Sequence, residues 1–482
     1  MSNAASTELP SPSTTEAIGH IEVYGVERIP ESARHGRPMG VAWVFFGAQM
    51  TYGSLLMGAL GPSLGLGWWS TVVAIIVGTL LGSLGVAAMA IIGPRTGTTS
   101  TVASGAFFGV RGRFVGVTIA MIIDLGYFAM ILWVSAPPLL HAAHILLDVP
   151  ESRFWTIAVL CGVAAVVLAL GILGHATLVA YEKFTAVANV ACMGVLVVSS
   201  IGSFHLAPVL SSETHLGFWP AWFLTTTGLI ANAVSYSTFA GDFTRYLPSD
   251  TRSGEVFGWT LAGMVAGCFF ALGCGAFLAL TVDKPSETAA AMLDHVSIVL
   301  LLPVVLIGFI GNASNGGMVA YNGTLNLHAL LWKLRRVDAA ILFSVIGILV
   351  GYIGLVAFDL MDSIVSLCSI VTVLVTPWIL INIIGVHENG GVFDAASLQE
   401  FSGGADARRY WFRNGFRPGA IVAWAIGAAV GLLFADTSIF VGPLAHFAGG
   451  IDLSFLGSGV TGALIYLAVY PPRRADTARV GA

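Results

Sequence analysis

Long apolar stretches alternate with short polar segments along almost the whole chain. Twelve of these stretches are long enough to cross about 30 Å of hydrocarbon as helices. They are residues 41–64, 69–92, 115–141, 155–174, 178–202, 217–241, 257–281, 298–323, 338–358, 361–385, 419–435 and 453–470. This pattern predicts an all-α polytopic membrane protein with twelve transmembrane helices.

The composition and the placement of charge agree with this prediction. Hydrophobic residues make up 56% of the 482 positions and charged residues only 10%, whereas soluble domains carry roughly 25% charged residues. With the N-terminus inside, only Arg153 and Lys284 of the 21 basic residues fall on the outer side. Because basic residues favour cytoplasmic segments, we expect a multi-pass protein of the cell (plasma or inner) membrane, in contact with lipid, with both termini cytoplasmic.

Several classes of function are disfavoured by what the sequence lacks. The five cysteines lie in apolar stretches and show neither metal-binding nor disulfide spacing. The chain contains no GxxxxGK[ST] loop and no strand-bounded GxGxxG, which argues against ATP-driven transport. Residues 1–40 are polar and do not resemble a cleavable signal peptide. We expect no cofactor and no nucleic-acid partner.

Two of the apolar stretches are interrupted by polar and helix-breaking residues. Residues 41–64 carry Gln49 and Thr51 near their middle and Pro62 near their end, and residues 217–241 carry Asn232 and Ser235. An unpaired polar group at membrane depth costs several kcal/mol, so these segments are expected to line a cavity. The alternative is a pair of packed helices whose small residues allow close approach.

The two interrupted stretches are five spans apart, which is typical of transporters built from two inverted repeats. This spacing gives a predicted division of the chain. It comprises a cytoplasmic tail (1–40), a first repeat with helices 1–5 (41–202), a second repeat with helices 6–10 (217–385), a cytoplasmic connection (386–418), helices 11 and 12 (419–470) and a cytoplasmic tail (471–482).

The third stretch contains the one ionisable side chain that we place near the membrane midplane. Asp124 lies nine residues into the stretch, at a depth of about 14 Å for a helix. A carboxylate there costs at least ~2.5–3.5 kcal/mol unless it is paired or hydrated. Tyr127 shares its helix face, so the pair suits a flat heterocycle with N–H groups. A protonated Asp124 bonded to a neighbouring helix, or a proton relay, are the alternatives.

The eighth stretch and the residues just after it are also unusually polar, with several glycines and four amides, Asn312, Asn315, Asn322 and Asn326. Hydroxyl and carbonyl oxygens are the ligands that small hard cations prefer. Ile310, Ala313 and Ser314 have the same i, i+3, i+4 spacing as Gly47, Met50 and Thr51 in the first stretch. The two faces form a candidate cation site. Residues 94–114 are too polar to span a membrane, and we expect them to lie along the cytoplasmic surface.

Several motifs together resemble the nucleobase–cation symporter family, of the purine/cytosine permease type. They are PESARHGRP, LGLGWW, GPRTG, FGVRG, YSTFAGDFTRYLPSDT, YNGTLNL and GIDLSFLGSGVTGALIY. The resemblance extends from about Ile29 to Tyr466. It implies a LeuT-like fold of five plus five helices in inverted repeat with two extra C-terminal helices, helices 1 and 6 being broken.

The resemblance also implies positions for the binding sites. Substrate contacts would come from Thr51 beside Gln49 in span 1, from Asp124 and the stacking residue Tyr127 in span 3, from Asn232, Ala233 and Ser235 in span 6, and from Asn315 in span 8. A sodium site would be formed by the carbonyls of Gly47, Met50 and Ile310 together with Ala313 and Ser314.

Three departures from the family pattern concern these positions. Tyr127 stands where Trp is usual, Asp124 where a neutral residue is typical, and Ala313 where a second hydroxyl is usual. The resemblance implies import of a nucleobase or related heterocycle by symport with a proton or sodium through alternating access. Allantoin, hydantoin or thiamine are alternative substrates. A channel and a membrane enzyme are more distant alternatives, and the sequence leaves the oligomeric state open.

Overall fold

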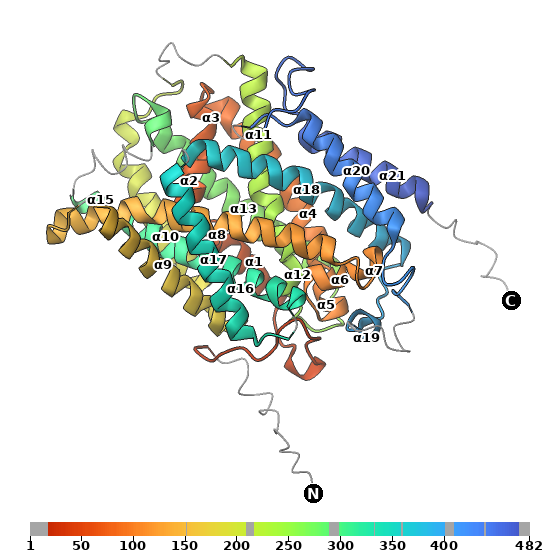
Figure 1. Ribbon diagram of the computed structural model, residues 1–482. Helices are drawn as coiled ribbons and strands as arrows, with labels where there is room; N and C mark the ends of the chain where they lie inside the picture. Colours follow the sequence, from red (N-terminus) through yellow and green to blue (C-terminus); the bar gives the residue numbers. More distant parts are fainter. Residues whose placement is uncertain are drawn as a thin grey trace, which may run out of the picture.

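The computed structural model describes residues 18–150, 152–208, 216–288, 298–331, 333–357, 360–400, 409–437 and 440–471. Over these ranges the protein is all-helical, with two isolated β-bridges and no strand (Figure 1). The first 17 residues of the predicted N-terminal tail, part of the 386–418 connection and nearly all of the 471–482 tail lie outside the described residues.

Within this part of the chain, eight helical segments are long and apolar enough to cross a membrane. Seven are built on α4 (Trp68–Ala90), α8 (Phe114–Leu147), α9 (Arg153–Leu173), α10 (His175–Ser199), α13 (Ser253–Ala279), α17 (Arg336–Ala357) and α18 (Leu360–Glu388). The eighth joins α15 (Ile298–Leu306), the π-helical turn η5 (Ile307–Gly311) and α16 (Asn312–Leu330). They correspond to predicted spans 2–5 and 7–10. The crossing count of twelve stays a prediction.

The remaining elements are shorter. The last two predicted spans correspond to α20 (Pro418–Phe434) and α21 (Ser454–Val469), which pack on each other and against α18 (Figure 1). Short helical turns complete the chain: η1 (Glu31–Ala33), α5 (Ile92–Thr96), α6 (Ser100–Ala103), α7 (Gly105–Phe108), η2 (Ile201–Ser203), η4 (Pro285–Glu287) and α19 (Ala395–Leu398).

The first predicted span is not a continuous helix. It consists of α1 (Pro38–Gly47), α2 (Tyr52–Gly58) and α3 (Leu60–Ser63), and residues 48–51 between α1 and α2 are non-helical. Thr51 has extended backbone and accepts a hydrogen bond from the Ser54 N–H at 3.0 Å, so it is the N-cap of α2.

The sixth predicted span changes its winding in the same way. It runs from α11 (Phe218–Val234) through the 3₁₀ turn η3 (Ser235–Thr238) to α12 (Ala240–Thr244). The Ser235 hydroxyl donates to the Asn232 carbonyl at 2.9 Å, and the Thr238 hydroxyl donates to the Ser235 carbonyl at 3.0 Å. Such bonds compete with the helical ladder, which explains why the run of hydroxyls coincides with η3.

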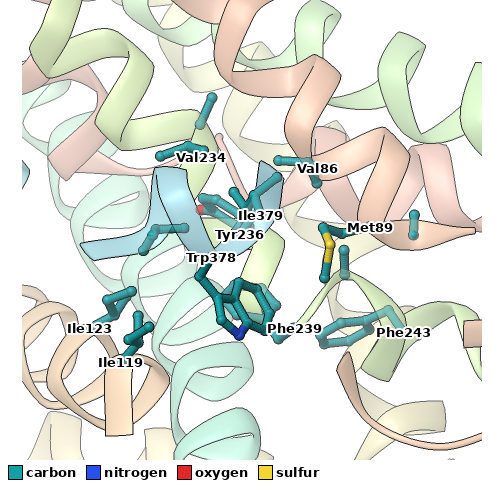
Figure 2. Close-up of a cluster of buried hydrophobic side chains, with 14 of the residues drawn as sticks. Val86, Met89, Ile119, Ile123, Val234, Tyr236, Phe239, Phe243, Trp378 and Ile379 are labelled. Atoms are coloured by element: carbon teal, nitrogen blue, oxygen red, sulfur yellow. The ribbon is translucent and has the colours of Figure 1, made fainter. Parts of the chain in front are cut away.

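Hydrophobic side chains from several helices enclose this unwound segment. Figure 2 shows Val86 and Met89 of α4, Ile119 and Ile123 of α8, and Trp378 and Ile379 of α18 converging on Val234, Tyr236, Phe239 and Phe243. All ten belong to one buried core cluster and are at most 5% exposed. The irregular backbone is therefore surrounded by protein, the setting in which it is tolerated at membrane depth.

The helix pairings of the first half recur in the second. α1 packs on α10 and α13, and α11 packs correspondingly on α18 and α4. Likewise α8 packs on α9 and α17, and α16 packs on α17 and α9. Helices five spans apart, such as α1 and α11 or α10 and α18, therefore have equivalent neighbours. This equivalence is expected for a LeuT-like inverted repeat.

Glycines make the closest of these pairings possible. A Cβ atom on Gly82 of α4 would lie 2.7 Å from the Ile230 carbonyl oxygen of α11. A Cβ on Gly263 of α13 would lie 2.3 Å from the Ala42 carbonyl oxygen of α1, and one on Gly275 would lie 2.0 Å from that of Leu55 in α2. Small residues at such contacts let helix backbones approach where lipid supplies no hydrophobic driving force.

The expectation that residues 94–114 lie along the cytoplasmic surface is wrong. Most of this segment is buried, and Val102, Ala103, Phe107 and Phe108 have no exposed surface. The Ser100 N–H donates to Asp242 at 2.9 Å, which fixes α6 beside α12. The polar residues of the segment therefore bond to other parts of the protein instead of facing water.

The glycine contacts predict a position-specific stability effect in α13. Gly275→Ala places a methyl group against the Leu55 backbone and should cost about 1–3 kcal/mol, lowering the melting temperature of the purified protein. Gly273→Ala is the control, because nothing lies within 4 Å of a Cβ at that position. Equal melting temperatures for the two variants would contradict the close α2–α13 contact.

Candidate functional site

A cavity lies where the interrupted helices meet α8, α16 and α18. Its free volume is small, about 40 Å³. It is lined by Thr51, Gly53, Ser54, Met57, Tyr127, Met130, Ile131, Val134, Asn232, Asn312, Asn315, Ile364, Leu367 and Cys368. The lining is mostly apolar, with a few amides and hydroxyls in positions to orient a ligand.

Four residues predicted to contact substrate line this cavity: Thr51, Tyr127, Asn232 and Asn315. The Tyr127 hydroxyl has no hydrogen-bond partner among the described residues. A buried donor of this kind costs about 1–3 kcal/mol when unsatisfied. The tyrosine therefore offers both a ring face and a free hydroxyl to a ligand.

The polar wall of the cavity is held by bonds between the two interrupted helices. The Asn232 amide donates to Gln49 Oε1 at 3.1 Å. The Tyr236 hydroxyl lies 3.3 Å from the Ala48 carbonyl and 3.2 Å from Asn315 Oδ1. Through these contacts η3 and α11 connect the non-helical residues 48–51 to α16.

Three other predicted contact residues lie behind the cavity wall. Gln49 is fully buried and supports Asn232. Ala233 points at α4, since its Cβ would lie 2.7 Å from a Cβ on Gly82. Ser235 is 3% exposed and donates to the Asn232 carbonyl.

Asp124 is held by α16 and does not line the cavity. Its carboxylate accepts hydrogen bonds from Asn322 Nδ2 at 2.8 and 3.0 Å and from Asn326 Nδ2 at 3.0 Å. Asn326 in turn accepts from the Thr101 hydroxyl at 2.9 Å. The cost of burying this carboxyl is offset by amide donors, and the network ties α8 and α6 to α16.

The two halves of the predicted cation site lie against each other. A Cβ on Gly311 would lie 2.2 Å from the Met50 carbonyl oxygen, so η5 touches the break between α1 and α2. Ala313 and Ser314 are fully buried in the next turn of α16, and the Ser314 hydroxyl lacks a hydrogen-bond partner among the described residues. Gly47 and Ile310 belong to the same two segments.

Sequence reasoning missed three residues at this site. Tyr236 bridges the cavity wall, and Asn189 of α10 donates to the Met50 carbonyl at 2.7 Å. Glu182 of α10 is fully buried beside Gly47. A signal for the last two was present, because Glu182 and Asn189 are seven residues apart and so share one helix face.

The N-terminal segment packs against the end of the molecule that the basic residues predict to be cytoplasmic. Glu22 is 5% exposed and accepts hydrogen bonds from the beginnings or ends of several helices. Its donors are the His175 N–H (2.9 Å), Arg245 (3.1 Å), Tyr321 (2.9 Å), Arg336 (3.4 Å) and Tyr246. Burial alone would raise the pKa of Glu22, but the guanidinium groups of Arg336 and Arg245 outweigh burial and lower that pKa from 4.5.

On the opposite side, a second hollow adjoins the cavity. Its free volume is only about 10 Å³, and it shares Ile364 and Cys368 with the cavity lining. Leu60, Thr227 and Asp452 are among its other lining residues. Because these residues precede or follow predicted outer loops, the hollow extends from the cavity toward the predicted outer face.

Comparison of the sequence with known families and proteins gives consistent matches. Residues 28–457 match the sequence model of the family described as "Permease for cytosine/purines, uracil, thiamine, allantoin". A Bacillus subtilis (strain 168) protein named "Putative purine-cytosine permease YxlA" is 25% identical over 94% of this chain and 96% of its own length. The Saccharomyces cerevisiae purine-cytosine permease FCY2 is 25% identical over 60% of this chain and 54% of its own length.

Solved structures with a similar fold are also found. Mhp1, a nucleobase-cation-symport-1 family transporter in a closed conformation with bromovinylhydantoin bound, superimposes with a TM-score of 0.73 at 14% identity, covering 94% of this chain and 97% of Mhp1. A sodium-coupled sialic acid symporter has a TM-score of 0.59 at 10% identity, covering 92% of each chain. At these identities the likeness concerns the fold alone.

The amide network predicts that Asp124 matters for stability. Asp124→Ala leaves two buried amides without their acceptor and should cost about 2–4 kcal/mol, measured as a lower melting temperature of the purified protein. Asp338→Ala is the matched control, because Asp338 forms a solvent-exposed pair with Arg335, and such pairs contribute little to stability. A stability loss no larger than the control's would contradict the network.

Proposed function

Because this chain belongs to the family of permeases for cytosine/purines, uracil, thiamine and allantoin, we propose that it imports a nucleobase or related small heterocycle together with a cation. Transport proceeds by alternating access in the cell membrane, with both termini in the cytoplasm. The family consists of permeases, so the site is assigned to binding and release and not to catalysis.

The observation that carries this proposal is the cavity at the junction of the two interrupted helices. Its lining is mostly apolar, with a few amides and a tyrosine hydroxyl that makes no bond to the described residues, which is the composition found in small-molecule sites. A channel would require a continuous polar path or a selectivity ring, whereas the polar lining residues here cluster at one level between α2, α8, α11 and α16.

We assign roles to the residues that line the cavity. The heterocycle lies against the ring of Tyr127, whose hydroxyl and the amides of Asn232 and Asn315 bond to its ring nitrogens and carbonyl oxygens. Asp124 acts as a positioning residue, since it orients the α16 helix that carries Asn315. The candidate coupling ion, proton or sodium, is assigned to the seam between η5 and the α1–α2 break.

The Glu22 cluster supplies the closed cytoplasmic side that alternating access requires. It joins the N-terminal segment to the cytoplasmic ends of α10, α12, α16 and α17. Opening toward the cytoplasm must separate some of these ends, so the cluster contributes to the energy difference between the two states.

Binding and uptake measurements test the cavity assignment. Asn315→Ala and Tyr127→Phe should each weaken binding of the preferred heterocycle about tenfold, the value of one lost hydrogen bond of ~1.4 kcal/mol. Asn389→Ala, after the cytoplasmic end of α18, is the control. The measurements are isothermal titration with cytosine, adenine, uracil, allantoin, hydantoin and thiamine, and counterflow of the bound compound in proteoliposomes. Failure of every compound to bind, or non-saturable flux, would contradict the proposal.

Hydrogen exchange tests the cytoplasmic cluster. Glu22→Gln removes the charge that pairs with Arg245 and Arg336 and should cost about 3 kcal/mol, speeding exchange of residues 18–34 roughly 100-fold. Because the folded-state pKa of Glu22 is lowered, its stabilisation is complete at neutral pH and is lost as the pH falls below about 4.5 through that pKa. Glu27→Gln, an exposed position on the same segment, should behave as wild type; equal exchange in both variants would refute the cluster's role.

A further inference from the structure

One face of α10 carries polar side chains to which the proposed function assigns no role. Glu182, Thr185 and Asn189 follow at i, i+3 and i+7, which places them on one helix face. All three have no exposed surface. A carboxyl group in that setting requires a partner of opposite charge or a set of donors.

The oxygen atoms of this face lack such partners. Both carboxyl oxygens of Glu182, the Thr185 hydroxyl and Asn189 Oδ1 have no hydrogen-bond partner among the described residues, and neither has the Ser314 hydroxyl opposite. No described basic side chain forms an ion pair with Glu182. An uncompensated buried charge costs about 3–5 kcal/mol, so the Glu182 carboxyl must hold either a proton or a cation.

The carboxylate lies at the break between α1 and α2. A Cβ on Gly47 would lie 2.7 Å from Glu182 Oε2 and 2.4 Å from the Glu182 carbonyl oxygen. Gly47 is the last residue of α1, where helix carbonyls carry partial negative charge. The absence of a side chain at Gly47 is therefore what admits the carboxylate to this position.

The other side of the same space is formed by η5 and α16. Ser314 lies close to the Glu182 carboxyl without a hydrogen bond of normal geometry between them, and a Cβ on Gly311 would lie 2.5 Å from Asn189 Nδ2. Asn189 donates to the Met50 carbonyl at 2.7 Å and so joins α10 to the break. Residues of three separate segments thus lie around the Glu182 side chain.

We propose that Glu182 is the anionic ligand of a buried sodium site in which Ser314 and the Gly47 carbonyl take part. This proposal rests on the proposed cation-coupled function and names the charged ligand of its ion site. Carboxylate, hydroxyl and carbonyl oxygens are hard ligands. One carboxylate suits a monovalent ion, and no group of three His, Cys, Asp or Glu occurs among the described residues to hold a divalent metal.

This assignment accounts for Ala313, which contributes no oxygen where the family usually has a hydroxyl. The carboxylate of Glu182, from a different helix, supplies an additional ligand and a full negative charge. A cation held by α10, the α1 end and α16 would stabilise these segments in contact, and removing the ion would leave the carboxylate uncompensated.

The test uses the purified full-length protein in nanodiscs. Its melting temperature is measured in sodium chloride and in choline chloride at equal ionic strength, with ²²Na⁺ binding measured directly. We expect sodium to raise the melting temperature of the wild type. Glu182→Gln should abolish this rise and lower the ²²Na⁺ affinity at least tenfold. Ser314→Ala should also weaken the ²²Na⁺ affinity. Glu255→Gln, an exposed acidic position in the first turn of α13, should keep the wild-type response.

The outcomes separate this inference from the proposed function. Heterocycle binding that persists in Glu182→Gln shows that the variant is folded; if that variant cannot be purified, the Ser314→Ala affinity decides. The sodium site is overturned if the wild type binds heterocycle but shows no sodium response. It is also overturned if the wild type takes up heterocycle with a pH gradient alone. Either result leaves the transport proposal standing. An unchanged sodium response in Glu182→Gln and Ser314→Ala also overturns the sodium site. Absence of heterocycle binding with sodium binding intact would instead overturn the proposed function.

Discussion

The absence of water at membrane depth is the constraint on which the rest of this structure depends. Each polar group placed there must bond to protein, ligand or ion, because an unpaired group costs several kcal/mol. The chain satisfies this requirement at Asp124 with the amides of Asn322 and Asn326. It does not satisfy it at Tyr127 or Glu182, whose polar atoms have no hydrogen-bond partner among the described residues. Under the proposals made above, Tyr127 contacts the heterocycle and Glu182 contacts the cation.

Two of the motifs that carry the family resemblance join distant segments and do not line the cavity. In the GDFTRYLP stretch, Asp242 accepts from the Ser100 N–H, while Arg245 and Tyr246 bond to Glu22. In the GPRTG stretch, Arg95 donates to the Gly391 carbonyl at 2.8 Å and to the Ser253 hydroxyl at 2.7 Å. These residues hold together segments that are far apart in sequence. Because they hold the fold and do not line the cavity, such motifs identify a family without identifying a substrate.

Hydropathy and the spacing of the interrupted spans predicted the all-helical fold, since both properties are local in sequence. The buried position of residues 94–114 was not predictable in this way, because a polar segment has the same composition whether it faces water or protein. The separation of Asp124 from Tyr127 has a similar cause. Residues three apart share a helix face, but at 1.5 Å per residue they lie about 4.5 Å apart along the axis. That distance puts Tyr127 in the cavity and Asp124 against Asn322. Glu182 escaped notice because it precedes Lys183 near a span end, where charge is ordinary.

The arrangement of the two positions explains how binding at one would affect the other. Met50 and Ser314 belong to the proposed cation site. The residues that directly follow them in the chain, Thr51 and Asn315, line the cavity. Tyr236 connects the two segments through Ala48 and Asn315. A cation that fixes the α1–α2 break and α16 would therefore also fix Thr51 and Asn315, so part of the ordering cost of heterocycle binding is already met. By thermodynamic linkage the heterocycle must strengthen cation binding by the same factor, and this reciprocity is what symport requires of neighbouring sites.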